Sequence, residues 1–163
     1  MMRRALLTLG FLGAAGLIAT AVLGYGAHTA SETEMRAHVL VSLGASLVLM
    51  FSHTWIVLYL IATGQVITRV VRERGYEPEI LEAARKLRMH TLPWLLAALG
   101  AVIATFVVGG AAYSGALPGI LHHALFYVTL VAQAGAMVVE SRVLQAQDRL
   151  ALDLTRRAEA DAA

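Results

Sequence analysis

Charged residues are nearly absent from four long stretches of the chain, and the lengths of these stretches predict four membrane-spanning helices. The apolar runs favour helices over about residues 5–25, 37–68, 91–113 and 120–143. A helix crosses the hydrocarbon core of a bilayer with about 20 apolar residues, so each run is long enough. Short links between runs favour antiparallel neighbours. The chain is therefore predicted to be an all-α, up-down-up-down bundle that forms one integral membrane domain over residues 1–163.

The segments outside the spans carry helix signals of their own. Ser31 followed by Glu34 matches a capping box, so the second helix is expected to begin before it enters the membrane. The charged segment after the second span is expected to hold a short interfacial helix over residues 78–87. Pro93 is expected in the first turn of the third span. Residues 144–163 alternate apolar and charged positions, which predicts an amphipathic helical tail.

The basic residues predict the orientation of the bundle. Of the 13 Lys and Arg residues, two precede the first span, six lie between the second and third, and four follow the fourth. Only Arg36 falls on the other side. Because positively charged loops stay in the cytoplasm, both termini are expected there, in a multi-pass protein of the bacterial inner membrane.

Composition narrows the function. The chain is 58% hydrophobic and only 15% charged, with a mean hydropathy of +0.68, which is typical of a small membrane protein. It contains no cysteine, which excludes thiolate metal sites, iron–sulfur clusters and covalently attached haem. The basic residues follow the topology, so no nucleic-acid partner is expected. The sequence shows no nucleotide-binding or hydrolase motif and no internal repeat.

Two histidines lie in the second span, where an ionisable side chain is by default a candidate for function. His38 and His53 are 15 residues apart, which at about 100° per residue places them on broadly the same helix face. At 1.5 Å per residue they are about 22 Å apart along the axis, most of the ~30 Å hydrocarbon core. One imidazole is therefore expected near the outer membrane surface and the other toward the inner surface.

The predicted topology assigns further residues to each level. His122 and His123 begin the fourth span at the outer face, and because adjacent helical residues point about 100° apart, only one of them is expected to face the bundle axis. His28, in the first link, is a weaker outer candidate. Candidate inner partners are His90 and Met137, since methionine ligates haem iron beside histidine in some cytochromes.

These features together match the needs of haem b. Haem requires axial ligands from opposite sides, a slot for its flat ring and cations near its propionates. Histidines of the second and fourth spans are candidate ligands, and glycines of the first and third spans leave space. Arg36 is the candidate cation at the outer face, and Arg88, with its neighbours Arg85 and Lys86, at the inner face.

The spacing resembles that of the membrane b-type cytochromes, above all the dihaem bundle of the cytochrome bc and b6f family. In that family, histidine pairs 13 or 14 residues apart hold one haem near each membrane face. The resemblance rests on His38, His53 and either His122 or His123. It departs from the family at Met137, where a second histidine would be expected.

The resemblance implies an electron-carrying subunit rather than a stand-alone enzyme. It would hold either one haem b, near the outer face, or two, with the second toward the inner face, and exchange electrons with quinone or a partner redox protein. Three alternatives stay open: a structural or assembly subunit of a larger membrane complex, a transition-metal site at His38, His122 and His123, and a pigment-binding bundle.

Overall fold

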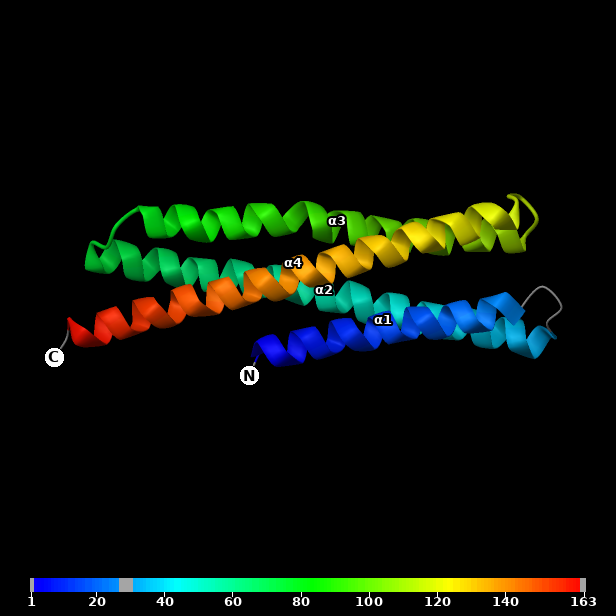
Figure 1. The fold of residues 1–163 in the computed structure, drawn as a ribbon, viewed down its shortest axis with the longest axis horizontal. Helices are drawn as coiled ribbons and strands as arrows, with labels where there is room; N and C mark the ends of the chain where they lie inside the picture. The colour runs from blue at the N-terminus through cyan, green and yellow to red at the C-terminus, as the bar shows by residue number, and fades with distance from the viewer. Residues whose placement is uncertain (1, 27–30, 162–163) are drawn as a thin grey trace.

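The computed structural model is a bundle of four antiparallel α-helices, as predicted. It describes residues 2–26 and 31–161. Helix α1 covers Met2–Gly26, α2 covers Glu32–Arg74, α3 covers Glu79–Tyr113 and α4 covers Gly119–Ala160. Figure 1 shows α1 beside α2 and α3 beside α4, with the two chain ends toward the same end of the bundle. His28 lies outside the described residues.

All four helices are long and apolar enough to cross a membrane, with mean hydropathies of 1.5 to 2.2 over their most apolar windows. Many large apolar side chains, such as Phe11, Leu40 and Val131, are exposed on the outside of the bundle. An apolar exterior of this kind is stable in contact with lipid and unfavourable in water. By helix length and hydropathy the chain is a multi-pass membrane protein.

Three of the helices extend well past the fourth. Helix α2 has 43 residues, which at 1.5 Å per residue is about 64 Å, twice a ~30 Å hydrocarbon core. Helix α1 begins halfway along the bundle, and α2, α3 and α4 continue beyond it (Figure 1). We call this three-helix extension the stalk. Ile67, Val71, Ala84 and Leu154 form its buried core.

The ends of α2 follow the expected capping chemistry. Ser31 and Glu34 form a complete capping box, in which the Ser31 amide donates to Glu34 Oε2 over 2.7 Å. At the other end, Gly75 closes the helix with φ +67°, a left-handed conformation that glycine adopts without a steric penalty. Both ends of α2 are therefore capped by local hydrogen bonds outside the apolar region.

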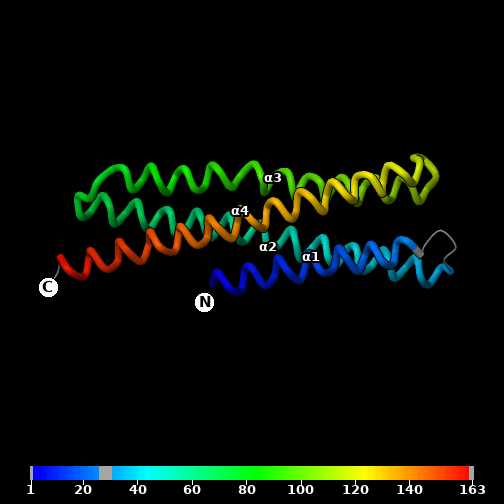
Figure 2. The backbone as a smooth tube through the Cα atoms, viewed as in Figure 1, coloured from blue at the N-terminus to red at the C-terminus, as the bar shows by residue number. Residues whose placement is uncertain are grey.

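The start of α3 differs from the prediction. The expected interfacial helix over 78–87 and the third span form one helix, and Pro93 lies inside it rather than in a first turn. Figure 2 shows the backbone of α3 continuing without interruption from the stalk into the apolar region. A proline inside a helix removes one backbone hydrogen bond. Packing of Leu81, Ala84 and Leu87 against α2 and α4 keeps the first three turns in line with the rest of α3.

Candidate cofactor site

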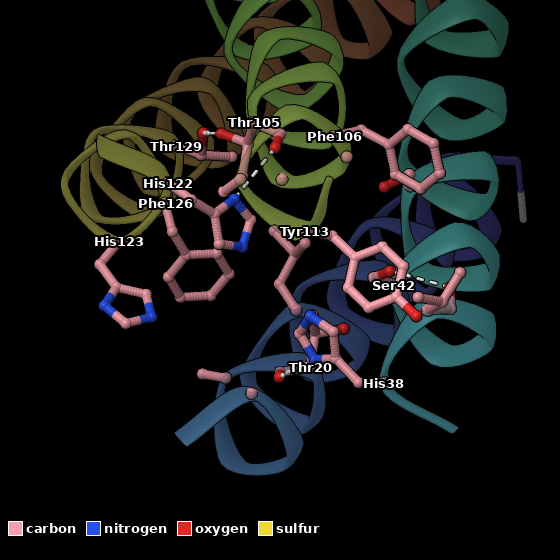
Figure 3. A pocket seen from close by; sticks show the side chains of 18 of the residues that line it. Thr20, His38, Ser42, Thr105, Phe106, Tyr113, His122, His123, Phe126 and Thr129 are labelled. Atoms are coloured by element: carbon pink, nitrogen blue, oxygen red, sulfur yellow. Dashed lines mark hydrogen bonds between the residues drawn. The ribbon is translucent and has the colours of Figure 1, made fainter. Parts of the chain in front are cut away.

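A cavity of about 600 Å³ opens among all four helices, at the end of the bundle opposite the stalk. Its lining includes threonine, glycine and histidine from each hairpin and aromatic side chains from three helices. His38 reaches it from α2, and His122 and His123 reach it from α4. In Figure 3 the ring of His38 and the ring of His122 enter the cavity from two different sides. The cavity therefore joins the predicted outer histidines in one place.

The ring of His38 lies against the backbone of α1. Its Nδ1 is 3.1 Å from the carbonyl oxygen of Thr20. A β-carbon added at Gly24 would lie 2.9 Å from Cε1 of the same ring. Any larger residue at position 24 would push the imidazole away, so glycine at this position is what allows the close approach.

The ring of His122 has the same surroundings in the other hairpin. Its Nδ1 is 3.2 Å from the carbonyl oxygen of Thr105 on α3. A β-carbon added at Gly109 would lie 2.8 Å from Cε1 of His122. Gly110, next to it, lines the cavity, and a β-carbon there would meet no atom within 4 Å.

These carbonyl contacts determine which ring nitrogen carries the proton. A carbonyl oxygen only accepts hydrogen bonds, so Nδ1 of His38 and Nδ1 of His122 must donate to Thr20 and Thr105. A neutral imidazole protonated at Nδ1 keeps its lone pair on Nε2. Metal-binding histidines are commonly held in this way, with one ring nitrogen donating to a carbonyl while the other ligates.

The two halves of the site have the same construction. In each hairpin, one helix carries a threonine and, four residues later, a glycine, and both contact the histidine of the other helix. The histidine follows the glycine by 14 residues in the first hairpin (Gly24 to His38) and by 13 in the second (Gly109 to His122). Sequence comparison within the chain had indicated no repeat, because only these few positions correspond. The correspondence lies in the packing of a glycine-bearing helix, α1 or α3, against a histidine-bearing helix, α2 or α4.

His123 also lines the cavity but has different neighbours. Its ring centroid is 6.0 Å from that of Tyr25, with the planes tilted by 31°. The hydroxyl of Tyr25 in turn forms a short hydrogen bond with the hydroxyl of Tyr127. These aromatic groups connect α1 with α4 across the cavity, so His123 belongs to its wall.

His53 lies deeper in the bundle and is fully buried. Its Nδ1 is 2.5 Å from Oε1 of Glu140, and its Nε2 is 2.8 Å from Oε1 of Gln133. Gln133 also donates to the carbonyl of Ala98 over 3.4 Å. Both ring nitrogens therefore have side-chain partners on α4, and an iron atom at His53 would have to displace one of them.

The partners of His53 belong to a polar row that the histidine spacing did not reveal. Gln133, Glu140 and Gln147 follow one another at intervals of seven on α4, and all three are buried. Gln147 donates to Oγ1 of Thr63 on α2 over 3.0 Å. An interval of seven keeps residues on one helix face. This interval between polar residues could have been read from the sequence as a sign of the buried row. The row satisfies the buried His53, which was a candidate ligand for a second, inner haem.

The other predicted residues lie away from this cavity. Met137 is half-buried between Gln133 and Glu140 along α4, and His90 is exposed on α3. Arg36 is exposed on α2 and is not part of the cavity wall. Arg88 lies at the far end of the apolar region, against Gly64.

A compact transition-metal centre has no counterpart in the described part of the chain. Across residues 2–26 and 31–161, no group of three or more His, Asp or Glu side chains is arranged to hold a metal ion. His38, His122 and His123 line one cavity without forming such a group.

Comparison with protein-family models, with curated proteins and with solved structures finds no match for this chain. The assignment of function therefore depends on the geometry of the site.

Proposed function

We propose that the protein is a membrane b-type cytochrome subunit that binds one haem b in the outer cavity and carries electrons. The observation behind this proposal is the pair of imidazoles, His38 and His122, whose Nδ1 atoms are both bound to backbone carbonyls in one cavity. This arrangement leaves both Nε2 lone pairs for axial ligation. Haem b takes one or two such ligands.

The cavity suits the size of the group and its apolar ring, and none of the described lysines or arginines lines it near the propionates. Cofactor sites in proteins occupy about 300–1,000 Å³, and this one has about 600 Å³. Its wall includes Leu17, Val102, Phe106 and Phe126, which would contact an apolar macrocycle. Gly110 leaves open space on the α3 side, as the predicted use of glycine requires.

The residues of the chain would set the properties of the site. When bound, the iron supplies a one-electron redox centre. The two carbonyl contacts hold the imidazole planes and make Nε2 more basic, which strengthens a ligand bond. The apolar wall keeps water away, and the location near one end of the spans brings the group close to a partner at that membrane surface. One electron enters from a donor and leaves to an acceptor, and no atom is transferred.

The orientation and the partners form part of the proposal. The basic residues gather on the stalk side, which the positive-inside rule places in the cytoplasm with both termini. The cavity then faces the outer side of a bacterial inner membrane. A quinone or another redox subunit would supply or receive the electron.

We propose one haem rather than two. A second haem at His53 would require the imidazole to leave Glu140 or Gln133, which would expose a buried carboxylate or amide to hydrocarbon. Neither Met137 nor His90 lines the cavity that His38 and His122 enter. His53 is better explained as the central member of a hydrogen-bonded α2–α4 contact.

An absorption spectrum of the purified protein tests the proposal. Protein produced in cells with ample haem should show the α band of reduced haem b, with one haem per chain by extraction. His38→Ala and His122→Ala should each lose that haem while the chain still inserts into the membrane. His123→Ala is the matched control, because the adjacent side chain lines the same cavity, and it should keep the haem.

The competing functions give different spectra. A colourless wild-type protein would support the structural-subunit alternative, and a chlorophyll-type spectrum would support the pigment alternative. Full haem retention in the His38→Ala/His122→Ala double variant would refute the ligand assignment. Two haems per chain, one of them lost in His53→Gln, would show that the inner site binds haem after all.

A further inference from the structure

A second pocket, of about 450 Å³, lies between α2 and α3 where the stalk meets the apolar bundle. We call it the arginine pocket, because Arg69, Arg72 and Arg88 line it together with Gly64, Gln65, Thr68 and Glu73. The positive charges of the three arginines outnumber the negative charge of Glu73. Among the described residues, ion pairs within 4.0 Å involve other basic side chains, such as Arg3, Lys86 and Arg157. The three guanidinium groups are thus available to an anion.

The position of Arg88 depends on a glycine. A β-carbon added at Gly64 would lie 3.0 Å from Nη1 and 3.2 Å from Cζ of Arg88. The guanidinium therefore lies directly against the α2 backbone, on the wall of the pocket and half-buried. Arg88 of α3 thus contacts the backbone of α2, and this packing fixes the position of its positive charge in the pocket.

The surrounding polar groups mark the level of the pocket in the bilayer. Arg3 on α1 is 4.0 Å from Asp148 on α4, which accepts a 2.6 Å hydrogen bond from Tyr59 on α2. Polar groups on three helices thus indicate the edge of the hydrocarbon core. Gly64 lies five residues after Tyr59, about 7 Å farther along the helix axis, and Arg69 lies ten residues after Tyr59, about 15 Å farther. Headgroups occupy roughly 5–8 Å beyond each edge of the core, so the near part of the pocket lies among them.

The pocket continues into an apolar surface on its membrane side. Leu58 and Ile61 are exposed on α2, on the same face as Gln65, and Leu92 is exposed on α3 one turn beyond Arg88. A molecule with an anionic end at the arginines would therefore have apolar side chains along its other end. This combination matches a phospholipid better than a free anion.

We propose that the arginine pocket is a specific site for an anionic glycerophospholipid, whose headgroup phosphate contacts Arg88 and the side chain of Arg69, while Arg72 adds positive charge on the water side of the pocket. Its acyl chains would follow Leu58, Ile61 and Leu92 into the bilayer. Basic pockets between membrane helices bind anionic headgroups by the same chemistry. The proposal is independent of haem binding in the outer cavity.

Native mass spectrometry of the detergent-purified chain, titrated with phosphatidylglycerol or phosphatidylcholine, tests this site. Wild type should retain phosphatidylglycerol and bind phosphatidylcholine much more weakly. Each arginine near a membrane surface contributes roughly fivefold in affinity, so R69Q/R72Q/R88Q should weaken phosphatidylglycerol binding on the order of a hundredfold. The control R4Q/R85Q/R149Q removes the same charge outside the pocket and should change it little. Gly64→Leu should displace Arg88 and weaken binding while keeping every charge.

Three results would overturn the proposal. Equal losses in the two triple variants would show that overall charge, and not this pocket, attracts the lipid. Wild-type affinity in Gly64→Leu would show that the position of Arg88 does not matter. Complete displacement of phosphatidylglycerol by millimolar inorganic phosphate would assign the pocket to a free anion, since the acyl chains would then add nothing.

Discussion

Under the proposed function, substituting Gly109 by alanine should weaken the binding of haem b, because the added methyl group displaces the ring of His122. The added β-carbon would lie 2.8 Å from Cε1 and 2.9 Å from Nδ1 of that ring. Carbon atoms in favourable contact are about 3.5–4.0 Å apart, so the imidazole must move by about 0.7 Å or more. The hydrogen bond from Nδ1 to Thr105 is already 3.2 Å long, and this movement would break it.

The size of the effect follows from the lost contact. A neutral hydrogen bond contributes about 0.5–1.5 kcal/mol, and removing the partner that orients a metal-binding histidine costs about 10–100-fold in affinity. We therefore expect Gly109→Ala to bind haem about tenfold or more weakly. Titration of the haem-free protein with haem, followed by absorbance, would measure the change.

A control variant separates this effect from general changes in α3. Gly100→Ala adds the same methyl group to the same helix, where a β-carbon would meet nothing within 4 Å. Both variants gain about 1 kcal/mol of helix propensity, so their difference isolates the contact with His122. Equal haem affinity in the two variants would refute the argument. Gly24→Ala should act on His38 in the same way, since its β-carbon would lie 2.9 Å from that ring.

Two further predictions concern stability. Glu140→Leu should leave Nδ1 of the buried His53 without an acceptor and destabilise the bundle by about 1–3 kcal/mol. Glu140→Gln should destabilise it less, and SDS-induced unfolding measures the stability of both variants. Equal stability of Glu140→Leu and wild type would contradict the contact. Hydrogen bonds from Ser31 hold the pKa of Glu34 below its ordinary value. A lowered folded-state pKa stabilises the start of α2 above the ordinary carboxyl pKa, and this stabilisation disappears as the pH falls through the lowered value. The protection of the amides at the start of α2 against hydrogen exchange, measured relative to their intrinsic rates, should fall there in wild type and depend less on pH in Ser31→Ala.

The sequence alone determined the class of the fold. The distribution of charge predicted four antiparallel helices, because a charged side chain inside the hydrocarbon is costly and few alternatives to a helix satisfy the backbone there. The capping box at Ser31 was readable for a similar reason, since it joins residues only three positions apart. The length of α3 was not readable, because packing of the stalk against α2 and α4 outweighed the breaking tendency of Pro93.

The tertiary structure decided which histidine belongs to which site. Spacing along one helix made His38 and His53 equal candidates for haem ligands. Their partners come from other helices, however, and helical periodicity does not specify which helices meet. Packing placed the carbonyl of Thr20 against His38 and the carboxylate of Glu140 against His53. It likewise distinguished His122 from His123 through the close approach of Gly109. A helix sequence predicts the face on which a side chain lies, whereas the atom that satisfies it depends on contacts between residues distant in the chain.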